Sequence, residues 1–155
     1  MSFRENLWHD DLAQINLADP LMVTPETSLR ETIETMRRAG KGCILICQGD
    51  SLKGIFTERD LVKRVMVAGA DLESPVSQFM SPNPVTLRRS DPIGLAIRTM
   101  YDGGYRRLPV VDANGSPIGI MSVKRLVQYL ADHFPLAVYN LPPQPRQIQE
   151  AREGA

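Results

Sequence analysis

Gly54-Ile55-Phe56-Thr57 and Gly119-Ile120-Met121-Ser122 are two copies of one short motif, 65 residues apart in the chain. Other segments repeat in the same order at offsets of 62 to 65 residues: 19–24 with 81–86, 33–36 with 97–100, and 61–62 with 126–127. Several matched segments in one order argue against chance. The chain therefore contains two copies of one structural unit, and a repeat of this kind decides the fold.

Each copy is predicted to begin with a short strand and a helix. In the first copy, residues 22–24 precede a helix that Ser28 caps, with Glu31 completing a capping box. Gly40 is expected to end that helix. In the second copy, Asp91 is the expected cap of the corresponding helix.

Two strands and a second helix follow in each copy. The predicted hairpins pair 43–47 with 52–56 around Gly49-Asp50, and 108–111 with 117–121 around Asn114-Gly115. A unit this small cannot cover its own sheet face, so two copies packed sheet to sheet bury more apolar surface. The sequence predicts an α/β (α+β) fold, in which two β-α-β-β-α repeats form one pseudo-twofold module. The expected segments are an N-terminal arm or short helix at 1–18, repeats at 19–72 and 73–133, and a C-terminal tail at 134–155.

Composition argues against several classes of partner. The 155 residues include 18 acidic and 18 basic side chains, so no global field draws the chain to nucleic acid or an anionic membrane. The longest apolar runs, such as 43–47, are too short to span a bilayer. The N-terminal residues lack the apolar segment of a secretory signal, and a cytoplasmic location is expected.

Catalysis and metal binding find little support in the sequence. Cys43 and Cys47 are expected to be free core thiols, and His9 and His133 have no metal-ligand spacing around them. We find no nucleophile, base and acid that form a set. The sequence therefore predicts a protein that is not an enzyme and needs no catalytic cofactor.

The repeated unit resembles a known family. Its element order, with Gly-apolar-apolar-Thr/Ser-x-x-Asp at the last strand-to-helix junction, resembles the cystathionine-β-synthase (CBS) domain. The similarity extends from about residue 19 to about residue 130 and is most specific at 54–60 and 105–112. Two such domains in tandem resemble a Bateman module, and without a catalytic domain in this sequence a stand-alone module is expected. The resemblance implies that AMP, ADP, ATP or S-adenosylmethionine binds between the repeats and regulates a partner protein, and that the chain forms a homodimer.

Thr57 stands where a predicted strand ends and a helix begins. Free backbone N–H groups at such a junction favour a phosphate, and the Thr57 hydroxyl adds a donor. The Asp60 carboxylate can accept hydrogen bonds from both hydroxyls of a ribose, which are the roles that the resemblance implies for these residues. Thr57 and Asp60 also form a near capping box, which needs no ligand. Both interpretations stay open at this stage.

The second copy departs from this pattern. Arg125 stands where the first copy has Asp60, and a cation cannot accept a hydrogen bond from a ribose hydroxyl. Ser122 keeps the hydroxyl, so a phosphate could still be held there. We therefore predict one competent adenosine site, built around the first motif.

The opposite repeat is expected to complete that site. Arg106 and Arg107 precede a predicted strand, a position from which the resemblance implies contact with phosphates. Lys124, early in the last helix, is expected to reach the same place. Together these three side chains would neutralise a polyphosphate, and an arginine can bind it in a bidentate manner.

The adenine ring needs an apolar slot. Pro84 and Val85 begin the second repeat at the matching place, and Phe56 is expected to form a wall. Ile55 could also form that wall, although a place in the core suits it better. Arg59, inside the first motif, completes the candidate nucleotide-binding residues.

Three functional interpretations follow. The first is an adenine-nucleotide sensor, with Mg²⁺ as a possible companion of ATP, and S-adenosylmethionine as another adenosine ligand. The second is a ligand-free, dimeric module for protein interaction. The third is nucleic-acid binding through the arginine cluster, against which the neutral net charge argues.

Overall fold

The computed structural model describes residues 2–134, so the C-terminal tail expected at 134–155 lies outside the described residues except for Phe134. No helix within residues 2–134 is both long and apolar enough to cross a membrane. The elements, in chain order, are α1 (Phe3–His9), η1 (Leu12–Gln14), β1 (Met22–Val23), α2 (Leu29–Ala39), β2 (Cys43–Gln48), β3 (Ser51–Thr57), α3 (Glu58–Asp60), η2 (Leu61–Met66), η3 (Val76–Gln78), β4 (Ser81–Pro82), β5 (Leu87–Arg88), α4 (Ile93–Gly103), β6 (Arg107–Val111), β7 (Pro117–Ser122) and α5 (Val123–His133). Here η1 and η3 are 3-10 turns, and η2 is a π-helical segment that continues α3.

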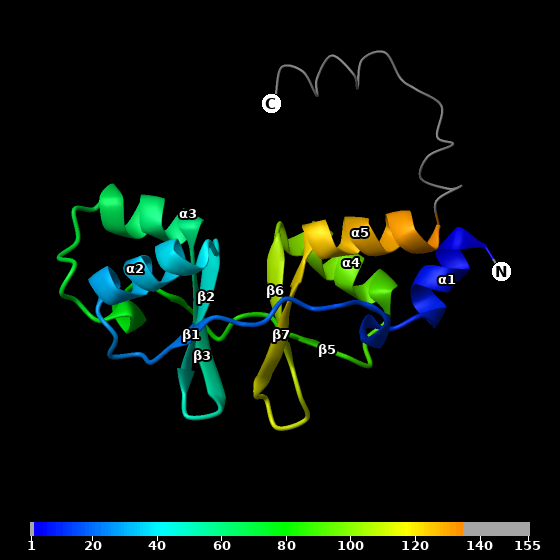
Figure 1. Ribbon diagram of the computed structural model, residues 1–155, viewed down its shortest axis with the longest axis horizontal. Coiled ribbons are helices and arrows are strands. Elements are labelled where there is room, and N and C mark those ends of the chain that lie inside the picture. Colours follow the sequence, from blue (N-terminus) through cyan, green and yellow to red (C-terminus); the bar gives the residue numbers. More distant parts are fainter. Residues whose placement is uncertain (1, 135–155) are drawn as a thin grey trace, which may run out of the picture.

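The two repeats form two small sheets that face each other in the middle of the molecule. One sheet has the order β1-β2-β3-β4 and the other the order β5-β6-β7. In Figure 1, α2 and α3 cover the outer face of the first sheet, and α4 and α5 cover that of the second. The predicted fold, two β-α-β-β-α repeats packed sheet to sheet as one module, is confirmed.

The first helix of each repeat starts differently from the prediction. The Ser28 hydroxyl accepts a hydrogen bond from the backbone N–H of Glu31 at 3.1 Å, but the Glu31 side chain makes no return bond. Asp91 is not the cap of α4: its carboxylate accepts from the backbone N–H of Arg88 at 2.8 Å and closes the turn after β5. Pro92 is the N-cap instead, because the Asp91 side chain is already used in that turn.

Apolar side chains fill the space between the sheets. Strand β2 turns Cys43, Leu45 and Cys47 toward the second repeat, where they form a cluster with Ile55 and Ile120. The alternate residues of β2 pack against the helices of the first repeat. Because β2 is buried on both faces, both cysteines are core residues; they are free thiols, and burial raises the pKa of each.

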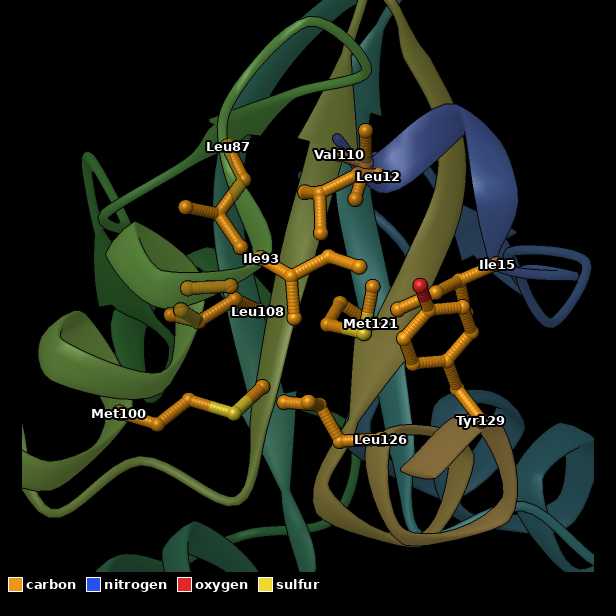
Figure 2. Close-up of a cluster of buried hydrophobic side chains, with 11 residues drawn as sticks. Leu12, Ile15, Leu87, Ile93, Met100, Leu108, Val110, Met121, Leu126 and Tyr129 are labelled. Carbon is orange, nitrogen blue, oxygen red and sulfur yellow. The ribbon is translucent and has the colours of Figure 1, made fainter. Parts of the chain in front are cut away.

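The segment that leads into each repeat packs against the core of the other repeat. Leu12 and Ile15 belong to the core of the second repeat; Figure 2 shows Leu12 near Val110, and Ile15 beside Met121 and Tyr129. Val76, 64 residues after Leu12, packs in the same way into the core of the first repeat. Residues 12–15 of the expected N-terminal arm are thus the structural counterparts of residues 76–79.

Backbone pairing follows the same exchange. Ala18 forms a bridge with Ile120 of the second repeat, and Ser81 pairs with Ile55 of the first. The backbone N–H of Leu12 donates to the Asp91 carbonyl at 3.0 Å. The two repeats therefore exchange segments and form one interlocked unit, and they are not two independent domains joined by a linker.

Helix α1 extends the core of the second repeat. The Trp8 ring lies 5.0 Å from the Arg98 guanidinium carbon, an arrangement typical of a cation–π contact. The rings of Phe3 and Phe134 meet edge to face with centroids 5.0 Å apart. The described N-terminal residues are thus held to α4 and to the end of α5.

Tyr129 predicts a pH dependence of stability. Its hydroxyl donates to Asp10 at 2.9 Å, and burial together with Asp10 raises the pKa of Tyr129 to about 12. The native state holds this proton more tightly than the unfolded chain, whose tyrosine pKa is about 10. The stabilisation is therefore complete below pH 10 and is lost as the pH rises from 10 to about 12.

Urea unfolding between pH 8 and pH 12 tests this expectation. The free energy of unfolding of Tyr129→Phe should fall less steeply above pH 10 than that of the wild type. Tyr101→Phe is the control, because Tyr101 is 86% exposed. Parallel curves for the wild type and Tyr129→Phe would show that Tyr129 titrates normally.

Candidate functional site

A cleft of about 690 Å³ opens between the two repeats. One side is the junction of β3 with α3, and the other is built by the β4–β5 connection and the start of β6. The residues that line it are Ile55, Thr57, Glu58, Arg59 and Asp60, then Ser81, Pro82, Asn83, Pro84 and Val85, and finally Gly104, Tyr105, Arg106, Arg107, Leu108 and Pro109. This region is called the first cleft below.

Thr57 and Asp60 form a complete capping box at the floor of the first cleft. The backbone N–H and the hydroxyl of Thr57 both donate to Asp60 Oδ2, at 3.0 and 3.1 Å. The backbone N–H of Asp60 donates back to Thr57 Oγ1 at 3.3 Å. The ligand-free role considered for this motif is therefore realised, and it holds both side chains in a fixed place.

The second carboxylate oxygen of Asp60 is less committed. Oδ1 lies 3.5 Å from Arg64 Nε, a longer contact than the bonds to Thr57. Arg64 also donates to the carbonyl of Met80 at 2.9 Å, which ties it to the chain entering β4. Asp60 is only 8% exposed, yet it lines the cleft. Because a carboxylate oxygen has two lone pairs, Asp60 can still accept hydrogen bonds from a ligand.

Three arginines line the first cleft together with this carboxylate: Arg59 lies beside Asp60 in α3, whereas Arg106 and Arg107 lie on the opposite side, at the start of β6. Arg106 is exposed and Arg107 half-buried. A Cβ atom added to Gly42 would lie 2.7 Å from Arg107 Nη2 and would also collide with Glu58 Oε1. The absence of a side chain at residue 42 therefore leaves room for an arginine of the opposite repeat.

The apolar part of the cleft differs from the prediction in one residue. Pro84 and Val85 line it, and Val85 is 43% exposed because β5 begins only at Leu87. Phe56 does not form a wall: it is fully buried among the helices of the first repeat. Ile55, next in the strand, points to the other face and lines the cleft instead.

Sequence reasoning also missed lining residues. Tyr105 belongs to the segment that carries the family resemblance, but it was not singled out as a candidate. Asn83 lines the first cleft from the loop between β4 and β5. Among the non-glycine residues that the structure describes, it is the one with a left-handed backbone, at a φ of 48°. Glu58 adds a carboxylate next to Arg107, and its place directly after Thr57 could have pointed to it.

A second, smaller cleft of about 360 Å³ lies at the corresponding place of the other half. Ser122 and Lys124 line this second cleft and not the first. The reason is that the junction of β7 with α5 is the counterpart, in the second repeat, of the junction of β3 with α3, and each junction lines its own cleft. The expectation that Lys124 joins Arg106 in one site is therefore wrong. Arg125 lies there as well, and its guanidinium donates to the carbonyl of Asn16 at 3.0 Å.

Comparison with protein families and with known proteins fits this geometry. The family model for the CBS domain matches residues 12–67 and 76–132. The meiotically up-regulated gene 70 protein of Schizosaccharomyces pombe is 34% identical over 109 residues. That match covers 70% of this chain and 15% of the yeast protein, so the chain spans a small part of that relative.

Solved structures share the fold. The structure of CBSX2 of Arabidopsis thaliana in complex with AMP has a TM-score of 0.70 and 23% identity, covering 79% of this chain and 97% of CBSX2. The CBS domain pair of protein MJ0100, in complex with 5-methylthioadenosine and S-adenosyl-L-methionine, has a TM-score of 0.66 and 17% identity, covering 74% of this chain and 93% of that one. At these identities the likeness concerns the fold.

Proposed function

Since the chain belongs to the CBS-domain family and carries two CBS domains in tandem, we propose that it is a regulatory module that binds an adenine nucleotide in the first cleft. One observation carries the proposal. The Thr57–Asp60 motif of one repeat and the Arg106–Arg107 pair of the other line the same cleft. A ribose acceptor and phosphate donors thus lie on opposite sides of one cleft.

Each part of a nucleotide has a matching group in this cleft. Asp60 accepts hydrogen bonds from the ribose hydroxyls through its less committed oxygen. Arg106 and Arg107 bind the phosphates, for which a guanidinium offers two parallel donors. Pro84 and Val85 supply apolar surface to the adenine ring. Arg59 also lines the first cleft and adds positive charge to it.

The charge of the cleft favours a nucleotide over S-adenosylmethionine. Structures of similar fold contain AMP in one case and S-adenosyl-L-methionine with 5-methylthioadenosine in another, so both ligand types suit this architecture. S-adenosylmethionine carries a sulfonium cation where a nucleotide carries phosphate. Arginines next to that position attract phosphate and repel a sulfonium.

Regulation follows if the ligand binds one arrangement of the two repeats more tightly than another. The module then signals to a partner protein and does not itself catalyse a reaction. Its homodimeric state, its cytoplasmic location and the presence of Mg²⁺ with bound ATP stay predictions.

Isothermal titration calorimetry with AMP, ADP, ATP and S-adenosylmethionine tests the proposal. The protein is first unfolded, washed and refolded to remove any ligand that purifies with it. Saturable binding of at least one phosphate-bearing ligand, tighter than that of S-adenosylmethionine, is expected. If none of the four ligands gives a measurable heat of binding at several temperatures, the proposal that the protein is a nucleotide sensor is wrong.

The second candidate is a ligand-free interaction module. The complete capping box favours it, because Thr57 and Asp60 then serve the fold without any ligand. Apolar side chains on and after η2 remain exposed, with Met66 at 67% and Val67 at 79%. Thermal unfolding separates the candidates: a ligand that binds only the native state raises Tm, whereas this module keeps the same Tm with every nucleotide.

A further inference from the structure

Arg107 lines both clefts. Resting on the proposed function, we infer that the second cleft binds a phosphate-class dianion and that this anion competes with the nucleotide for the Arg107 guanidinium. The two sites would then oppose each other through one shared side chain.

The second cleft has the charge for such an anion. Arg107, Lys41, Lys124 and Arg125 contribute four cations to its lining, against the single carboxylate of Asp19. Charge of one sign in a concave site attracts and concentrates ions of the other sign. A dianion is therefore the ligand that the second cleft suits electrostatically.

The same cleft lacks the features of a nucleoside site. Arg125 replaces the carboxylate that would accept ribose hydroxyls, and its bond to the Asn16 carbonyl holds it there. The cavity volume, about 360 Å³, is close to half that of the first cleft. A small phosphate fits these properties better than a nucleotide does.

The Arg107 guanidinium is free to serve either cleft. It makes no ion pair with any other residue between 2 and 134, although Glu58 lies nearby. Its charge is felt on the second-cleft side too, where it acts to lower the pKa of Cys43 against the larger effect of burial. The arginine thus lies at the boundary of two anion sites without a fixed partner.

One guanidinium cannot hold two anions in bidentate geometry at once. Phosphate in the second cleft therefore draws Arg107 away from the nucleotide in the first. By linkage, each ligand weakens the other by the same factor, for which about 5-fold is a typical lower value. Both clefts can still be occupied together, so the effect has an upper limit.

Nucleotide titrations in increasing inorganic phosphate, with chloride adjusted to constant ionic strength, test the inference. The apparent Kd for the nucleotide should rise by about 5-fold and then reach a plateau. Lys124→Gln should remove most of this rise, whereas Lys53→Gln, an exposed residue outside both clefts, should preserve it. A rise without a plateau that persists in Lys124→Gln would show direct competition in the first cleft and would overturn the inference.

A second measurement keeps this inference separate from the proposed function. In nucleotide-free protein, inorganic phosphate should raise Tm, and both Lys124→Gln and Arg107→Gln should reduce the shift. This readout needs no nucleotide binding, so it stands even if calorimetry detects none. An unchanged Tm in the wild type, or equal shifts in the wild type and both variants, would refute the second site.

Discussion

Asp60→Ala is expected to weaken nucleotide binding by about 10- to 100-fold, because it removes the carboxylate that accepts the ribose hydroxyls. A hydrogen bond to a charged group contributes about 1.5–3 kcal/mol, and each 1.4 kcal/mol is about tenfold in Kd. Calorimetry with the nucleotide that binds the wild type most tightly measures the change. Arg125→Ala, at the matching position of the second repeat, should have a smaller effect.

Asp60 also caps a helix, so its two roles must be separated. Asp60→Asn keeps an oxygen that can accept from Thr57, and its Tm should remain closer to that of the wild type than the Tm of Asp60→Ala. AMP and 2′-deoxy-AMP then report on the ribose itself. The wild type should prefer AMP, and Asp60→Ala should bind both alike.

The outcomes differ between the two roles. If Asp60→Ala weakens AMP and 2′-deoxy-AMP by the same factor, the carboxylate acts only through the fold of the cleft. If Arg125→Ala weakens AMP as much as Asp60→Ala does, the asymmetry between the repeats is wrong.

The first motif could be predicted from sequence because its chemistry is local. Thr57 and Asp60 are three residues apart, and a strand-to-helix junction holds them together whatever the rest of the chain does. Lys124 could not be placed in this way. Which of the two clefts Lys124 lines depends on where the start of α5 lies in the folded module. That position is decided by the pseudo-twofold packing of the two repeats, which is not a local property of the sequence.

The exchange of Phe56 and Ile55 has a related cause. Alternation along β3 predicts that the two side chains point to opposite faces. It does not say which face meets the helices and which meets the other repeat, because both faces of this sheet are apolar. Hydrophobicity therefore carried no information on which residue lines the cleft.

The repeats themselves were visible in the sequence, but their exchanged leading segments were not. Residues 10–15 and 74–79 share a glutamine, at Gln14 and Gln78, and apolar residues at two further positions of the same offset. That signal is weak because 3-10 turns tolerate many residues. The interlocking of Leu12 and Val76 with the opposite cores is a tertiary property of the duplicated chain.

Leu12→Ala is expected to lower the free energy of unfolding by about 2–5 kcal/mol, as large-to-small substitutions in a packed core do. Leu12 is fully buried, and it packs into the second repeat although it precedes the first in sequence. Loss of its side chain leaves a cavity among residues that come from strands and helices more than 70 positions later, such as Leu87 and Ile93.

Urea unfolding at neutral pH measures this effect, and the chain supplies its own matched controls. Val76→Ala tests the counterpart of Leu12 in the first repeat and should also destabilise, by a smaller amount because a valine loses fewer carbon atoms. Val127→Ala, at a residue 58% exposed on α5, should change the free energy of unfolding by less than about 0.5 kcal/mol. If Leu12→Ala lowers the free energy of unfolding by as little as Val127→Ala does, then the packing of residues 12–18 contributes little to stability, and the second repeat completes its core without them.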